Sequence, residues 1–222
     1  MKPISNDTNI VFAHVPKCAG SSVVVTLRGV YGNLHAFQWG AIDERFAAFL
    51  GSGKKNCFAY GHLRARHLDA LEASKMDFRL FTFLRDPVDR LISVYRYNAS
   101  PISPNYQAWI TSHPDFEAWV MGYPANDVSS FTVGAVGDMS EYLDKMYARF
   151  DFIGFQEHYE ESMTRLGRLL GHDLPCDRVE NATQATDHNR IEVSDELRAK
   201  IRDRNRMDCE VYQILKDVLY GD

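Results

Sequence analysis

The sequence predicts an α/β domain with a mostly parallel central sheet and helices on both faces of that sheet. Short apolar, strand-forming segments alternate along the chain with segments whose apolar residues recur at helical spacing, which is typical of parallel sheets. Residues 10–15 are mostly β-branched or aromatic, as in a strand buried on both faces. Residues 78–84 form a second strand-prone segment that runs into Arg85, Asp86 and Pro87. An Asp followed by a Pro is a favourable helix start.

The other elements follow from the same patterns, taken in chain order. Predicted strands cover residues 10–15, 57–60, 78–84 and 152–155, and predicted helices cover residues 23–30, 41–50, 63–73, 87–97, 116–121, 142–150 and 157–170. One long final helix is expected after its cap, Ser194. Four segments are polar or irregular in pattern and are expected to be connections: residues 32–40, 98–105, 122–137 and 175–190. No repeat or linker divides the chain, so we expect a single domain over residues 1–222.

The composition excludes several classes of protein. Hydrophobic residues at 45% and charged residues at 25% of 222 residues are ordinary for a soluble globular protein. No apolar run approaches the length of a membrane span, and the net charge of −5 argues against nucleic acid as the main partner. The four cysteines are scattered without metal-ligand spacing. They predict free buried thiols and no metal site, and they leave pairing across the fold open.

The turn after the first predicted strand has the composition of a phosphate-binding loop. It consists of Pro16, Lys17, Cys18, Ala19, Gly20, Ser21 and Ser22. Free N–H groups of a helix's first turn bind anions, small residues let the backbone approach, and a lysine adds a full charge. A Walker loop has its lysine after the second glycine, whereas Lys17 precedes the only glycine here. The alternative interpretation is an ordinary strand-to-helix turn with a surface lysine.

A second signature begins where the strand over residues 78–84 ends. Arg85 stands at the strand exit, and Ser93 lies two turns along the following helix, away from its apolar stripe. An arginine fork and a hydroxyl can together bind a phosphate dianion. The alternative is a capped amphipathic helix with a solvated serine, which explains Asp86 and Pro87 but gives no reason for Arg85.

These two signatures resemble those of PAPS-dependent sulfotransferases, where PAPS is 3′-phosphoadenosine 5′-phosphosulfate. Pro-Lys-x-x-Gly-Ser-Ser resembles their 5′-phosphosulfate loop, and Arg85-Asp-Pro with Ser93 resembles their 3′-phosphate element. His14-Val-Pro-Lys is most similar to the carbohydrate-type branch that includes heparan sulfate 2-O-sulfotransferase. The resemblance implies a three-layer, P-loop-like domain. It also implies sulfuryl transfer from PAPS to the hydroxyl of a carbohydrate or other small hydroxylated acceptor, with PAP as product and no metal.

His62 is the candidate general base, because an imidazole titrates near neutrality and can take the acceptor's proton. The pair Gly61-His62 after the second predicted strand resembles the position of a catalytic histidine in that branch. The branch has another histidine two residues earlier, where this chain has Tyr60. The alternative for His62 is a helix cap or a packed wall residue. Lys17 is expected to offset charge as PAP leaves, and His14 to order the loop from the strand below.

The acceptor and the rest of the adenosine site are less defined. Arg64 and Arg66 either bind an acidic acceptor or form a solvated helix face. In the resembled family a loop near residues 181–190 closes over the adenosine. Many eukaryotic members are membrane-anchored, so we expect a cytoplasmic protein or the soluble part of an anchored enzyme. The alternative functions are a P-loop-type nucleotide-dependent kinase and a non-catalytic PAP-binding module, and the sequence predicts no oligomeric state.

Overall fold

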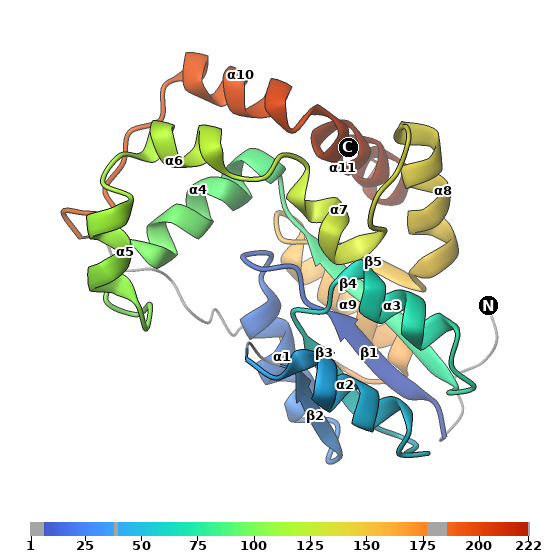
Figure 1. Cartoon of the computed structure of the whole chain (residues 1–222). Coiled ribbons are helices and arrows are strands. Elements are labelled where there is room, and N and C mark those ends of the chain that lie inside the picture. The colour runs from blue at the N-terminus through green and yellow to red at the C-terminus, as the bar shows by residue number, and fades with distance from the viewer. Residues whose placement is uncertain (1–6, 38–39, 177–185, 222) are drawn as a thin grey trace. The chain divides into compact units, whose positions relative to one another are not determined.

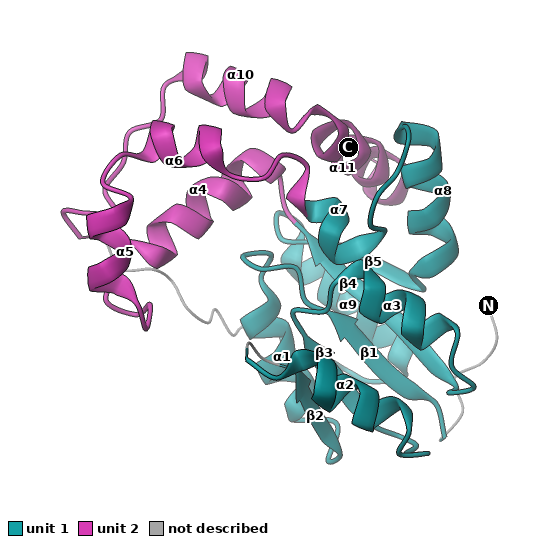
Figure 2. Cartoon of the chain, viewed as in Figure 1, with its two compact units in different colours: residues 1–84, 128–180 teal, residues 85–127, 181–222 magenta. Residues whose placement is uncertain are grey.

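The structure is a computed structural model, which describes residues 7–37, 40–176 and 186–221. The chain divides into two compact units (Figure 2). Unit 1 comprises Met1–Leu84 and Val128–Glu180, and unit 2 comprises Arg85–Asp127 and Asn181–Asp222. The single domain expected over residues 1–222 stays a prediction.

Unit 1 is built on a five-stranded sheet in which every pair of neighbouring strands is parallel (Figure 1). The strand order is β2-β3-β1-β4-β5, with bounds β1 Asn9–Ala13, β2 Leu34–Phe37, β3 Phe58–Gly61, β4 Phe78–Leu84 and β5 Phe152–Phe155. The central strand β1 is buried along its whole length, as expected for a parallel strand covered on both faces. The predicted α/β class and parallel sheet are confirmed.

Helices cover both faces of this sheet, because the chain reverses direction after β2. With right-handed crossovers, this reversal places α1 (Gly20–Arg28) on one face and both α2 (Ile42–Leu50) and α3 (Ala65–Glu72) on the other (Figure 1). The helix α9 (Tyr159–Leu170) lies with α1, since the ring of Tyr31 after α1 contacts that of His172 after α9. Unit 1 also contains α8 (Met139–Arg149) and all but the first residue of α7 (Asp127–Thr132). Because β1 and β3 are parallel neighbours, the loops that follow them lie at the same end of the sheet.

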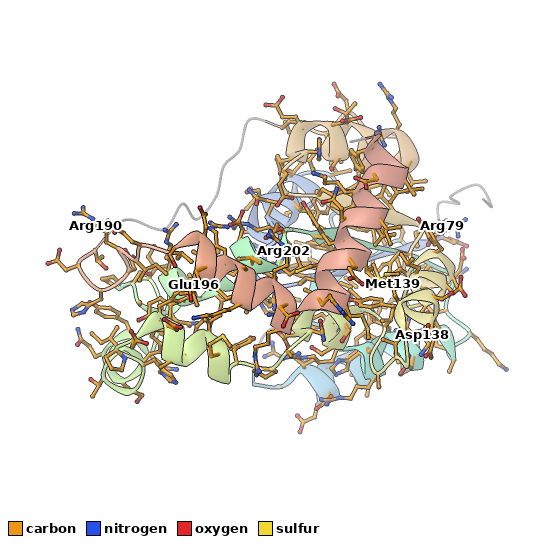
Figure 3. The ribbon with its side chains drawn as sticks, turned by 90° about the horizontal axis from the view of Figure 1, so that it is seen from above. Arg79, Asp138, Met139, Arg190, Glu196 and Arg202 are labelled. Carbon is orange, nitrogen blue, oxygen red and sulfur yellow. The ribbon has the colours of Figure 1, made fainter. Side chains whose placement is uncertain are left out.

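Unit 2 is helical within its described residues. It consists of α4 (Pro87–Asn98), α5 (Tyr106–Ser112), α6 (Phe116–Gly122), α10 (Asp195–Arg204) and α11 (Arg206–Tyr220). Its core includes Val88, Leu91 and Tyr95 of α4, packed with residues of α6 and α10. On α10, Figure 3 labels Glu196, which pairs with Lys200 at 2.9 Å, and Arg202, whose Nη2 lies 3.8 Å from an Asp86 carboxylate oxygen.

Three predicted features are wrong, and one further helix, α5, was not expected. Residues 32–40 contain the strand β2, a short edge strand whose polar and exposed positions hide its pattern. The helices α5 and α7 were not predicted, and α7 lies in a segment expected to be irregular. The final helix is interrupted at Asn205, whose side chain donates to the Ile201 carbonyl and accepts from the Asn126 backbone. Ser194 caps α10 as expected, accepting from the Leu197 N–H at 3.2 Å. No helix among the described residues is long and apolar enough to cross a membrane.

Candidate active site

The loop between β1 and α1 has the backbone of an anion-binding turn. Lys17 and Ala19 both adopt left-handed conformations, with φ of 69° and 59°, so the chain turns sharply into the helix. Ala19 is the N-cap residue, no described side chain caps α1, and the first turn of α1 contains no acidic residue. The N-terminal N–H groups and the positive end of the helix dipole therefore favour a bound anion.

The side chains of this loop differ in how far a ligand could reach them. Cys18 is buried, with its Sγ 3.8 Å from the Pro16 carbonyl oxygen, and Ser22 is only 5% exposed. Lys17 and Ser21 are partly exposed. Burial therefore favours Lys17 and Ser21 as the side chains that meet a ligand, with Cys18, Ala19, Gly20 and Ser22 contributing through the backbone.

His62 lies beside this loop because β1 and β3 are neighbours in the sheet. Ala13 pairs with Gly61 in the parallel register, so the next residues along the two strands, His14 and His62, come together. Their ring centroids are 4.5 Å apart, and the His14 N–H donates to the Gly61 carbonyl at 2.9 Å. The structure thus places a second imidazole next to His62, which comes from His14 and not from the position of Tyr60.

The hydrogen bond of His62 fixes its tautomer. Its Nδ1 lies 3.1 Å from the His14 carbonyl oxygen, and a carbonyl can only accept, so Nδ1 carries the proton. The lone pair is then on Nε2, which is the atom available to accept a proton. Burial lowers the pKa of His62, the hydrogen bond from Nδ1 opposes this effect, and the charge of Arg64 lowers the pKa further.

His14 is held in its neutral form by its surroundings. Burial lowers the pKa of His14 well below its ordinary value, and the positive charges of protonated His62 and of Lys17 lower it further. Of the two neighbouring rings, His62 is therefore the one expected to take up a proton first.

Three residues close to His62 in the sequence have intramolecular partners. The Tyr60 hydroxyl accepts from Arg28 of α1, and Tyr60 is only 4% exposed. Arg64 donates to the Ser130 hydroxyl and lies 3.7 Å from the centroid of the Phe131 ring. Arg66 is exposed and pairs with Asp43 of α2 at 2.9 Å.

Unit 2 contains the second sequence signature, which consists of Arg85, Asp86, Pro87 and Ser93. Asp86 caps α4 by accepting from the Asp89 N–H at 2.9 Å, and Pro87 is the first helical residue, as the sequence predicts. The Arg85 Nε is buried and has no hydrogen-bond partner among the described residues. Ser93 is half-buried on α4, outside the fully buried stripe of that helix. A buried guanidinium nitrogen without a partner is the feature that a bound phosphate would satisfy.

Two further expectations concern metals and the adenosine loop. No group of three or more His, Cys, Asp or Glu in the described part of the chain is placed to hold a metal ion. All four cysteines are free. Within the loop expected to close over the adenosine, residues 181–185 lie outside the described residues.

Comparison with known proteins identifies the family. The structure is similar to mouse sulfotransferase SULT7A1 complexed with PAP, with a TM-score of 0.50 and 14% identity over 90% of this chain, and it spans 64% of that chain. A sulfotransferase from Alicyclobacillus acidocaldarius gives a TM-score of 0.47 and 13% identity over 99% of this chain and 98% of that one. No curated protein matches by sequence. The model of the sulfotransferase family matches residues 3–214, nearly the whole chain. The chain therefore belongs to the sulfotransferase family.

Proposed function

We propose that this protein transfers a sulfuryl group from PAPS to the hydroxyl of an acceptor, which is a carbohydrate or another small hydroxylated molecule. The observation that carries the proposal is the meeting of an anion-binding loop and an oriented, neutral histidine at the carboxyl ends of β1 and β3. Ligands of open parallel sheets bind at this edge. Family membership supplies the reaction class.

The loop would hold the 5′ end of the donor. The backbone N–H groups over residues 18–22 and the Ser21 hydroxyl would bind the 5′-phosphate, and the Lys17 ammonium would offset charge on the oxygen from which the sulfuryl group departs. Arg85 and Ser93 are proposed to bind the 3′-phosphate. The support for Arg85 is its buried, unpartnered Nε, and that for Ser93 is its partial exposure on α4. PAPS itself supplies an activated sulfuryl group.

His62 would act as the general base. Its Nε2 would accept the proton of the acceptor hydroxyl as the new oxygen–sulfur bond forms. The Nδ1–H bond to the His14 carbonyl keeps the ring in the required tautomer throughout. Burial lowers the pKa of His62, which favours the unprotonated form that a base requires. Sulfuryl transfer otherwise asks mainly for alignment and charge stabilisation, as phosphoryl transfer does.

Calorimetry with PAP and ADP in the presence of a chelator tests the proposal. PAP should bind without a divalent metal and more tightly than ADP, because ADP lacks the 3′-phosphate. Lys17→Ala and Arg85→Ala should each weaken PAP binding by roughly 10- to 100-fold, since each removes a charge-assisted hydrogen bond. The control is Lys75→Ala, an exposed lysine that precedes β4. Equal PAP affinity in all four proteins would refute the assignment of the donor site.

Activity is measured with radiolabelled PAPS and a panel of hydroxylated acceptors that includes neutral and acidic sugars. Transfer to any member establishes the activity and ranks the acceptor classes. A protein that binds ADP with magnesium more tightly than PAP would instead favour a kinase.

A further inference from the structure

The imidazole of His14 is enclosed on three sides within unit 1. One face stacks on Phe12 with a centroid separation of 5.4 Å and an interplanar angle of 11°, and the ring packs on His62 with centroids 4.5 Å apart. Its nitrogen edge faces the backbone of Gly20, the first residue of α1. The ring therefore connects the proposed base to the first turn of the anion-binding helix.

Gly20 is what allows the His14 ring to lie there. A Cβ built on Gly20 would come within 1.9 Å of the His14 Nε2 and 2.0 Å of its Cδ2, well inside van der Waals contact. Any larger residue at position 20 would have to displace the ring.

We propose that His14 is a positioning residue for His62: its ring shields one face of the base from water and couples the orientation of the base to the first turn of α1. The proposal rests on the assignment of His62 as the base in the proposed function. It goes beyond the expectation that His14 merely orders the loop, because it makes the His14 side chain act through His62.

The two contacts of His14 with His62 have different origins. The hydrogen bond from the His62 Nδ1 goes to a main-chain carbonyl, so substitution of His14 leaves it in place. The ring contact comes from the side chain, with the two ring planes tilted by 36°, so substitution removes it. A variant with a small residue at position 14 therefore keeps the tautomer of His62 but loses the ring contact between His14 and His62.

Burial, more than the charged groups around the pair, sets the direction of the effect on the titration of His62. His62 is acted on by Arg64, and His14 by His62 and Lys17, while burial is the largest influence on both rings. Removal of the His14 ring admits water to the face of His62. Because burial lowers the pKa of His62, this hydration should raise that pKa toward its ordinary value.

Nuclear magnetic resonance titration of the His62 imidazole tests the coupling without requiring transfer activity. The signal is assigned by its loss in His62→Gln, and the parent is compared with His14→Ala, Gly20→Ala and the double variant. We expect the His62 imidazole to titrate at higher pH in His14→Ala than in the parent. Gly20→Ala should shift the titration of His62 when His14 is present, because the alanine Cβ displaces the His14 ring. In the double variant, which lacks that ring, Gly20→Ala should have no further effect on His62. His35→Ala, on the edge strand β2, is the matched histidine control.

Kinetics provide the second readout. His14→Ala should lower kcat by roughly 10- to 100-fold, as expected for a misplaced reacting group, while the affinity for PAP stays within about 2-fold of the parent. Thermal unfolding checks that each variant folds, and His14→Asn replaces His14→Ala if the alanine variant does not. An unchanged His62 titration in the folded variant would overturn the proposal, as would an equal effect of Gly20→Ala in both backgrounds. If the parent protein does not bind PAP but the His62 titrations change as expected, then the assignment of the PAPS site is wrong, whereas the coupling between His14 and His62 is supported.

Discussion

Arg85 yields a prediction in which stability and ligand binding change in opposite directions. Its buried Nε has no hydrogen-bond partner among the described residues, and a buried unsatisfied donor costs about 1–3 kcal/mol. Methionine is unbranched, flexible and without a donor to satisfy. We therefore expect Arg85→Met to raise the free energy of unfolding of the ligand-free protein by up to about 1–3 kcal/mol. For a chain of this length, each kcal/mol corresponds to about 2–4 °C in Tm.

Bound PAP should act in the opposite sense, because it should stabilise the parent much more than it stabilises Arg85→Met. At 100 times its Kd, PAP should stabilise the parent by about 2.7 kcal/mol. Loss of the arginine fork should weaken binding by roughly 100-fold, and the same PAP concentration then stabilises Arg85→Met by only about 0.4 kcal/mol. The variant should thus be more stable than the parent without PAP and should gain little from its addition.

Thermal unfolding with and without PAP measures both effects. Arg96→Met, on the helix α4 that follows Arg85, is the control, because Arg96 is exposed and an exposed substitution changes stability by about 0.5 kcal/mol or less. An Arg85→Met protein that is less stable than the parent and is stabilised by PAP to the same extent would show that Arg85 does not bind the 3′-phosphate.

Three further predictions follow from the described contacts. The kcat/KM for PAPS should fall on the acid side with an apparent pKa below 6.5, because His62 must be unprotonated and its pKa is lowered; a pH–rate profile shows the limb. Asp127→Asn should destabilise the protein by about 3–5 kcal/mol in denaturant unfolding, because Asp127 pairs with the buried Arg90 at 3.0 Å, whereas loss of an exposed pair should have little effect. Gly61→Ala should impair folding, seen as lost solubility or rapid proteolysis, since its Cβ would lie 2.1 Å from the Phe37 carbonyl oxygen on β2.

The local parts of the fold could be predicted from the sequence. The strand over residues 78–84 matches β4 at both ends, and the cap formed by Asp86 and Pro87 is as expected, because both depend on the local pattern. The strand β2 could not be predicted in the same way: it has four residues at the edge of the sheet, and Leu34 is 40% exposed. Its apolar signal is therefore weak.

The relation between residues far apart in the sequence could not be predicted. His14 and His62 meet only because β3 lies next to β1 with Ala13 opposite Gly61, and neither the strand order nor the register is encoded in a local pattern. The same holds for Arg66, whose partner Asp43 is on a different helix. The loop motif itself was recognisable, whereas the burial of Cys18 and Ser22 within it became apparent only in the structure.

The role of His62 as the general base is measured by comparing the parent with His62→Ala in transfer of radiolabelled sulfate from PAPS, after equal folding has been shown by thermal unfolding. We expect His62→Ala to retain the PAP affinity of the parent and to lose about 10²- to 10⁴-fold in transfer rate, the range typical of a positioned general base. A folded His62→Ala protein that transfers sulfate at the rate of the parent would show that His62 is not the base.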